Sequence, residues 1–412
     1  MSRIGTTATA LLCVLVVTLP ACGGVAWAQS PDVRPPIVMV SRMTMGRAVG
    51  PYRNPSVAVS RRGSLTVVAE AGPADQRHLE ITDVTFGSGW SQPLTVSLAG
   101  PGDCRDPFLA YDTSGTLHLV WAQAIGRAYA VRCATQTPDG LWHDQGALSQ
   151  TPDLDCLFPQ VAVGRTGRIW VAWQAGWASQ SNIYLALSDD GTTFAAPVAV
   201  TGDRSNTQNL YPQLFLDSNS ALNDASSRVD SPYPLVWYEE TATGFRLQAA
   251  VPNESGQGLQ TVAPLEFDRL NANLMPRVFQ APSGMLGGVW TDLVGNRART
   301  LVGFQDPASL GEGIVLGAGQ TADAEFPSAI AVDDKTVAVV WVNRTPEGCQ
   351  IMAGRVSGTT VAGPVLVCAS PTDGAMGRPC LVVTAGGVVH CVWASDPARG
   401  GSGDLQYAAL MY

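Results

Sequence analysis

The chain has 412 residues, with 34 acidic and 25 basic side chains and a formal net charge of −9. Lys335 is the only lysine. An acidic chain without a basic run is not expected to bind nucleic acid or an anionic membrane surface, so we exclude both as partners.

The first 28 residues predict a signal peptide. Arg3 precedes an apolar stretch, residues 8–19, that is too short to span a bilayer, and residues 26–28, Ala-Trp-Ala, fit a cleavage site. Residues 19–24 also resemble a bacterial lipobox with Cys22 as the lipidated residue. Both interpretations predict a secreted or periplasmic protein, and the second adds a lipid anchor at the cell envelope. No later segment is apolar for long enough to form a transmembrane helix.

From residue 36 onward the sequence repeats with a period of about 52 residues. Each repeat has a proline before a short alternating apolar run: Pro55, Pro107, Pro159, Pro212, Pro276, Pro327 and Pro379. In five repeats a tryptophan lies 14 residues after this proline: Trp121, Trp173, Trp290, Trp341 and Trp393. In the fourth repeat Trp237 lies 25 residues after its proline, which indicates an insertion, and the first repeat has Ala69 at this place.

Within each repeat the pattern predicts four antiparallel strands. Alternating apolar residues at 56–59, 169–173, 183–187 and 198–200 exemplify the four strands in turn. Such a repeat is typical of a propeller blade, because stacked blades bury the faces that one sheet leaves exposed. We therefore predict an all-β, seven-bladed β-propeller of four-stranded antiparallel blades over residues 36–412. Its repeats begin near residues 53, 105, 157, 210, 274, 325 and 377.

Two further features bear on how the ring closes and packs. The seventh repeat, from Pro379 to Tyr412, is one strand short, and residues 37–41 supply a spare strand. We expect this N-terminal strand to close the last blade as its outer strand. The tryptophans are expected to pack between blades, and a ring of sugar-stacking platforms is the alternative.

Seven cysteines follow the targeting segment, and an exported chain keeps disulfides. We expect three pairs and leave Cys133 free; the pairs are Cys380–Cys391, Cys349–Cys368 and Cys104–Cys156. The first pair follows from a two-residue turn at Ala385-Gly386, which would place the two cysteines directly opposite on neighbouring strands. Metal coordination is disfavoured because no Cys-x2-Cys spacing occurs and the four histidines are scattered. We expect no metal and no cofactor.

Residues 188–194, Ser-Asp-Asp-Gly-Thr-Thr-Phe, resemble the Asp box of sialidases and related BNR-repeat propellers. The family turn reads Ser-x-Asp-x-Gly-x-x-Trp; here the glycine falls one place early and Phe194 replaces the tryptophan. Residues 137–142 are a weaker relic. In such a turn the carboxylate caps backbone N–H groups and the aromatic ring packs beneath. The resemblance implies a sialidase-like propeller in which this turn is structural.

Residues 52–55, Tyr-Arg-Asn-Pro, resemble the Tyr/Phe-Arg-Ile-Pro motif of sialidases. The resemblance implies that Arg53 belongs to a three-arginine cluster that holds the substrate carboxylate, which a planar guanidinium binds bidentately. It also implies that Glu70 lies on the next strand and that Asp75 lies in the loop of the acid/base residue. No family motif surrounds a tyrosine nucleophile. The candidate catalytic residues are therefore Glu70, Asp75, Tyr238 and Glu239.

By the same resemblance, the position two residues before the proline faces the propeller axis. It holds Arg53 and Arg105 in the first two repeats, and Arg378 lies one residue out of register in the seventh. These three arginines predict an anion-binding site at the funnel. The alternative is that they form ordinary rim ion pairs with nearby carboxylates, namely Asp103, Asp106 and Glu70.

Two functions fit the sequence. A non-catalytic, exported propeller that binds a glycan or protein ligand at the funnel is favoured by the missing nucleophile pair and the reduced Asp boxes. An exo-sialidase-type glycoside hydrolase acting on an acidic sugar is the alternative, favoured by the motif at residues 52–55. It would require two suitably spaced carboxyl groups or a tyrosine nucleophile. We expect a monomer, and the sequence does not specify the ligand.

Overall fold

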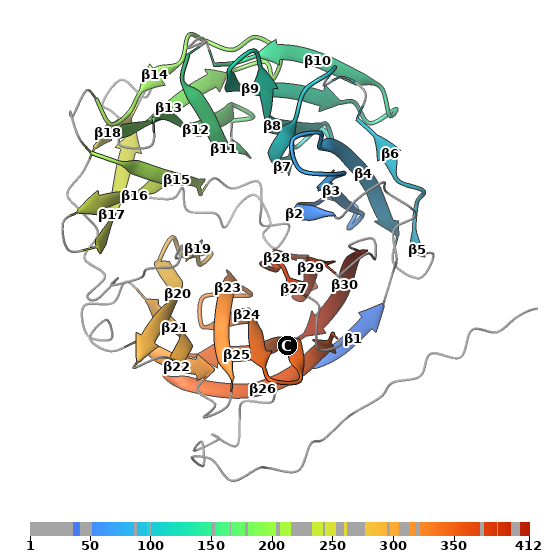
Figure 1. The fold of residues 1–412 in the computed structure, drawn as a ribbon, viewed down its shortest axis with the longest axis vertical. Coiled ribbons are helices and arrows are strands. Elements are labelled where there is room, and N and C mark those ends of the chain that lie inside the picture. Colours follow the sequence, from blue (N-terminus) through green and yellow to red (C-terminus); the bar gives the residue numbers. More distant parts are fainter. Residues whose placement is uncertain are drawn as a thin grey trace, which may run out of the picture.

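The computed structural model describes residues 36–41, 52–85, 89–96, 98, 100–149, 153–164, 166–177, 180–202, 207–215, 233–241, 244–252, 259–261, 277–294, 297–304, 313–317, 322–370, 375–384, 386–396 and 404–412. The predicted signal peptide and Cys22 lie outside them. The described residues form seven antiparallel sheets arranged as blades around one axis (Figure 1), which confirms the predicted seven-bladed propeller. They include no helix with the length and apolar composition needed to cross a bilayer.

The first three blades follow one another along the chain, and each begins with its innermost strand (Figure 1). Blade 1 contains β2 (Arg53–Val59), β3 (Leu65–Ala71), β4 (His78–Thr85), β5 (Gly89–Trp90) and β6 (Leu94–Thr95). Blade 2 contains β7 (Cys104–Tyr111), β8 (Leu117–Ile125), β9 (Ala128–Gln136) and β10 (Trp142–Ala147). Blade 3 contains β11 (Asp155–Val163), β12 (Ile169–Trp177), β13 (Gln180–Ser188) and β14 (Val198–Ala199).

The remaining four blades complete the circle. Blade 4 contains β15 (Asn209–Leu214), β16 (Leu235–Thr241), β17 (Gly244–Pro252) and β18 (Leu259–Thr261). Blade 5 contains β19 (Arg277–Gln280), β20 (Leu286–Val294), β21 (Arg297–Phe304) and β22 (Ile314–Gly317). Blade 6 contains β23 (Asp323–Ala331), β24 (Thr336–Thr345), β25 (Gly348–Ser357) and β26 (Thr360–Ala369). Blade 7 contains β27 (Ala375–Met376), β28 (Cys380–Val383), β29 (Val388–Asp396), β30 (Asp404–Met411) and β1 (Ile37–Ser41).

The N-terminal strand closes the ring as predicted. β1 pairs antiparallel with β30, from Ile37 opposite Met411 to Ser41 opposite Tyr407. Figure 1 shows β1, drawn in blue, beside the red C-terminal strand at the outer edge of blade 7. The two ends of the propeller therefore share one sheet, so the ring has no unpaired seam between its first and last blades.

The repeat tryptophans pack between neighbouring blades. All six are buried, with at most 6% of each residue exposed: Trp121, Trp173, Trp237, Trp290, Trp341 and Trp393. Trp173, for example, packs with Val120 and Val131 in the hydrophobic layer between blades 2 and 3. Burying a large apolar side chain contributes about 1.5–3 kcal/mol. The predicted inter-blade packing is confirmed, and the alternative of sugar-stacking platforms is wrong.

A β-bulge precedes the repeat proline on the innermost strand of five blades. In blade 2, Asp106 and Pro107 together oppose the single residue Trp121. The residue before the proline has a left-handed backbone, with φ between 45° and 52°, at Asn54, Asp106, Phe158, Tyr211 and Phe326. Such a φ is uncommon outside glycine, and bulges re-aim neighbouring side chains. The bulge explains why this residue, one position later than expected from the sequence, faces the axis.

The turn between β28 and β29 is one residue longer than predicted. The Thr384 N–H donates to the Val388 carbonyl, so three residues form the loop instead of two. Gly387 takes a φ of 73°, in the left-handed region that a three-residue hairpin loop needs at this position. The longer loop shifts the register of the two strands by one residue relative to the prediction.

This register shift separates the cysteines that were expected to face each other. Cys380 lies opposite Val392, and Cys391 lies opposite Leu381. Because side chains alternate along a strand, a shift of one residue places the two thiols on opposite faces of blade 7. Cys380 packs toward blade 1, whereas Cys391 is in the layer between blades 6 and 7. The predicted direct pairing across this hairpin is therefore wrong.

No disulfide joins any two of the seven cysteines in the described residues. Cys349 and Cys368 lie on β25 and β26 as predicted and share one hydrophobic layer, but Cys368 faces Ile351. Cys104 packs between blades 1 and 2, and Cys156 packs between blades 2 and 3. Disulfide formation at these two predicted pairs stays a prediction. No group of three metal-ligating side chains occurs within the described part of the chain.

Candidate functional site

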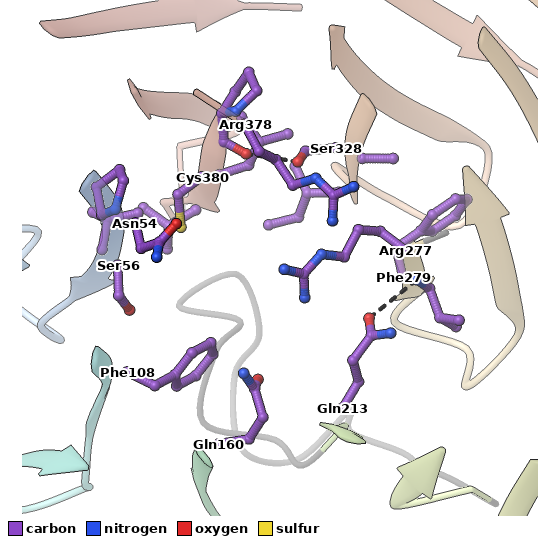
Figure 2. Close-up of a pocket in the computed structure, with 18 of the residues that line it drawn as sticks. Asn54, Ser56, Phe108, Gln160, Gln213, Arg277, Phe279, Ser328, Arg378 and Cys380 are labelled. Carbon is purple, nitrogen blue, oxygen red and sulfur yellow. Dashed lines mark hydrogen bonds between the residues drawn. The ribbon is translucent and has the colours of Figure 1, made fainter. Parts of the chain in front are cut away.

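A cavity of about 900 Å³ lies on the propeller axis and is lined by the innermost strands. Two rings of side chains dominate its wall, and Figure 2 labels members of both. The residues before the prolines form one ring, with Asn54, Asp106, Phe158, Tyr211, Phe326 and Arg378. The residues after the prolines form the other, with Ser56, Phe108, Gln160, Gln213, Arg277, Ser328 and Cys380. Among the described residues, six blades contribute to both rings and blade 5 contributes Arg277 to the second.

Two arginines from different blades face each other in this cavity. Arg277 begins β19, and Arg378 stands two residues before β28. Figure 2 shows both guanidinium groups extending into the cavity and toward one another. Burial, together with the nearby charge of Arg277, lowers the pKa of Arg378 to about 9. We call these two residues the arginine pair; like charges held close in a partly buried wall favour an anion between them.

Neutral polar groups beside the arginine pair are held in place by hydrogen bonds. The Val278 N–H donates to Gln213 Oε1 at 3.1 Å, which orients the amide of Gln213 in the wall (Figure 2). Ser328 Oγ donates to the Pro379 carbonyl at 2.6 Å. On the other side of the ring, Asn54 Nδ2 donates to Glu70 Oε1 at 2.7 Å. These bonds fix donors and acceptors before any ligand arrives.

Aromatic side chains form the wall opposite the arginine pair. Phe108 from β7 points into the cavity across from the guanidinium groups in Figure 2. Phe158 and Tyr211 pack edge to face, with ring centroids 4.7 Å apart. The cavity therefore combines the arginine pair from blades 5 and 7 with aromatic side chains from blades 2 to 4.

Asp106 is the only carboxylate among the described residues that line the cavity. Its backbone N–H donates to Glu70 Oε1 at 2.8 Å. Burial and the charge of Glu70 raise the pKa of Asp106 to about 7, although a hydrogen bond from the Phe158 backbone opposes the shift. Asp106 therefore changes charge near neutral pH inside a cavity that otherwise carries positive charge.

The predicted three-arginine cluster is only partly formed. Arg53 and Arg378 line the cavity, whereas Arg105 does not. Arg105 Nε donates to Asp103 at 2.7 Å, and its guanidinium lies 4.6 Å from the Tyr129 ring centroid. Arg105 thus forms the rim ion pair that was the alternative for it. In blade 2 the bulge turns Asp106 toward the axis, and the bond to Asp103 holds Arg105 at the rim.

The sequence prediction missed Arg277, the second member of the arginine pair. Arg277 directly follows Pro276, and the prediction did not consider the position after the proline. A signal was available, because the repeat aligns residue 277 with the first residues after the prolines of the other blades. Residue 277 is the only arginine among the seven positions that follow the repeat prolines.

A buried ion network occupies the rim between blades 1 and 2. Arg77 donates to both oxygens of Asp103, at 2.9 and 2.6 Å, and to Glu70 at 3.0 Å. Tyr129 and Arg105 also donate to Asp103, each at 2.7 Å. We call Arg77, Asp103, Glu70 and Arg105 the rim network. Its charges are balanced, with two guanidinium groups and two carboxylates.

The candidate catalytic residues are not brought together. Tyr238 and Glu239 are consecutive on β16, so their side chains point to opposite faces of the sheet. Glu239 pairs with Arg246 at 2.5 Å, and Tyr238 is buried behind Gln213. Asp75 is 88% exposed at the rim. Glu70 is fully buried in the rim network rather than in the cavity.

The turn after β13 has the local capping expected from its sequence. Asp190 Oδ1 accepts hydrogen bonds from the backbone N–H groups of Thr192 and Thr193, at 2.8 and 2.6 Å. Phe194 packs against the layer between blades 2 and 3. The assignment of this turn as an Asp box stays a prediction. The turn lies on the outer part of blade 3 and does not line the cavity.

No family model matches the chain, and no curated protein sequence matches it. A solved structure of an unknown-function protein from Dyadobacter fermentans is 15% identical with a TM-score of 0.49, covering 90% of this chain and 99% of that one. The intramolecular trans-sialidase from Ruminococcus gnavus is 12% identical, with a TM-score of 0.47 and coverages of 90% and 97%. The α-L-arabinanase from Penicillium chrysogenum is 12% identical, with a TM-score of 0.48 and coverages of 92% and 98%.

Proposed function

We propose that the protein is an exported, sialidase-like propeller that binds a carboxylated glycan in its axial cavity without turning it over. The arginine pair is the observation that carries this proposal. Arg277 and Arg378 converge from two blades on one space, and planar guanidinium groups match carboxylate oxygens with two parallel hydrogen bonds. Export is supported by the signal-peptide pattern of residues 1–28.

The cavity favours a small acidic sugar over the acidic side chain of a protein. Its volume of about 900 Å³ falls in the range of small-molecule sites. Phe108 and Phe158 offer flat apolar surfaces for the C–H faces of a sugar ring, and the amides of Asn54, Gln160 and Gln213 offer partners for its hydroxyl groups. A protein ligand is the second partner class, and it would have to insert an aspartate or glutamate between the same two arginines.

Binding without turnover is supported by the cavity's inventory of acidic groups. Glycosidases of most families use two carboxyl groups about 5–10 Å apart. Asp106 alone supplies a carboxylate among the described lining residues. A sialidase-type hydrolase remains the second candidate function, favoured by one observation: a carboxyl with a pKa of about 7 suits general acid–base catalysis.

Isothermal titration calorimetry with N-acetylneuraminic acid, galacturonic acid and neutral N-acetylglucosamine tests the proposal. We expect an acidic sugar to bind and the neutral sugar not to bind. Arg277→Gln and Arg378→Gln should each weaken binding about 10- to 100-fold, because hydrogen bonds to charged groups are worth about 1.5–3 kcal/mol. Arg299→Gln is the matched control: this arginine is also in blade 5 but pairs with Asp292 at 2.7 Å outside the cavity.

A fluorogenic sialoside separates binding from catalysis. The proposal expects no turnover above background with purified protein. Turnover that Arg53→Ala abolishes would overturn the non-catalytic assignment and support the hydrolase. Equal binding of acidic and neutral sugars would instead contradict the role of the arginine pair.

A further inference from the structure

Asp106 shares the axial cavity with the arginine pair, and its surroundings decide what it does there. Four charged or titratable groups face it from the elements packed around it. They are Glu70 on β3, Arg77 after β3, Arg105 on β7 and Tyr211 on β15. Asn54 and Phe158, from the neighbouring blades, complete the surroundings with neutral groups.

The neighbouring arginines already form ion pairs with other carboxylates. Arg77 and Arg105 both donate to Asp103, and Arg77 also donates to Glu70. Within the described residues neither forms an ion pair with Asp106. Glu70 instead accepts from the backbone of Asp106 itself, so a fixed negative charge lies beside this carboxyl. The pKa of Asp106, raised to about 7 by burial and by Glu70, is the electrostatic consequence.

An anion in the cavity changes this balance. It brings negative charge into a small, partly buried space that already holds the carboxyl of Asp106. Repulsion between two anions at short range disfavours the ionised form of the weaker acid. A neutral Asp106 removes that repulsion and also gains an O–H donor for the ligand.

We propose that Asp106 takes up one proton from solvent when an anionic ligand occupies the axial cavity, which makes the cavity a proton-coupled binding site. This inference rests on the proposed function. The proton goes to a carboxylate oxygen of Asp106 and returns to solvent when the ligand leaves. By linkage, a site that gains a proton on binding holds its ligand more tightly as pH falls. The cavity therefore captures an acidic ligand in acidic surroundings and releases it in alkaline ones.

Calorimetry with N-acetylneuraminic acid at pH about 6 and pH about 8.5 tests this inference. The carboxylate of this probe stays ionised throughout, so the pH dependence reports on the protein. We expect the affinity of the natural chain to fall about tenfold across this range, the change that one pKa unit of coupling produces. Titrations near neutral pH in two buffers of different ionisation enthalpy should show net proton uptake.

Asp106→Asn should bind the probe with an affinity that is nearly the same at both pH values. Asp75→Asn is the matched control, because Asp75 follows β3 in the adjacent blade 1 but is 88% exposed and outside the cavity. It should retain the pH dependence of the natural chain. Proton uptake needs no substitution, so a poorly folded Asp106 variant does not prevent the test.

The outcomes separate this inference from the proposed function. Binding that is equally tight at both pH values, without proton uptake, overturns the role of Asp106 and leaves the arginine pair standing. Proton uptake that persists in Asp106→Asn also overturns it. Absence of binding at either pH contradicts the proposed function itself.

Discussion

The rim network and the arginine pair use the same residue type in opposite ways. In the rim network, Arg77 and Arg105 both donate to Asp103, and the charges balance. In the cavity, Arg277 and Arg378 face each other and extend their guanidinium groups into one space. The first arrangement stabilises the fold, whereas the second directs two guanidinium groups into the cavity. An arginine that donates to a carboxylate at the rim is therefore distinguished from one that extends into the cavity.

The largest expected effect comes from removing the central charge of the rim network. Asp103→Asn leaves Arg77, which is only 10% exposed, without its main partner. Breaking one side of a buried ion pair typically costs about 3–5 kcal/mol. We expect a loss of this size in the free energy of unfolding, measured by urea denaturation at neutral pH. Asp189→Asn removes an ion pair whose carboxylate is 77% exposed and should cost less than about 1 kcal/mol.

The rim network should also affect how stability depends on pH. Although burial opposes it, the hydrogen bonds from Arg77 and Arg105 hold the pKa of Asp103 well below its usual range. A carboxyl with a depressed pKa stabilises the fold above the pKa of the unfolded chain, about 3.9, and this contribution is lost as pH falls below it. The natural chain should therefore lose stability in this acidic window. Parallel stability curves for the natural chain and for Asp103→Asn between pH about 5 and pH about 2 would contradict this assignment.

Removing one member of the arginine pair should change stability in the opposite direction. Arg277→Gln removes one of two like charges, and the charge of Arg277 is one cause of the lowered pKa of Arg378. We expect the melting temperature at neutral pH to stay unchanged or to rise, by an amount equivalent to about 1 kcal/mol at most. A destabilisation as large as that of Asp103→Asn would show that Arg277 holds the fold together, and the contrast between the two regions would fail.

The smallest effect is expected at Arg105, the arginine that the sequence placed wrongly in the cluster. Its side chain is 33% exposed and outside the cavity, so Arg105→Gln should cost about 1 kcal/mol or less in stability. Affinity for an acidic sugar, measured by calorimetry, should stay within about twofold of the natural chain. A tenfold loss of affinity would restore Arg105 to the binding site.

The fold was predictable because its signals recur in every repeat. Seven prolines and the tryptophan ladder established the period, and the short seventh repeat indicated the closing strand β1. Single-residue register was not predictable. In five blades a bulge turned the residue directly before the proline toward the axis, and the longer loop at Gly387 placed Cys380 and Cys391 on opposite faces. Successive side chains of a strand point to opposite faces of the sheet. A shift of one residue therefore changes which side chains lie on a given face.

The site depended on this register, and it was therefore predicted only in part. Arg53 and Arg378 were identified, whereas Arg277 and Asp106 acquired their roles only when seven blades converged on one axis. Neither residue belongs to a local motif that would reveal its role. Their proximity arises from repeats that are far apart in the sequence, and spacing within one repeat carries no information about it.

A crystal structure of the protein soaked with N-acetylneuraminic acid tests the central claim most directly. We predict that the sugar carboxylate lies between the guanidinium groups of Arg277 and Arg378, with the ring against Phe108 and Phe158. Density for the sugar at the outer rim, or inside the cavity with its carboxylate directed away from both arginines, would contradict the account.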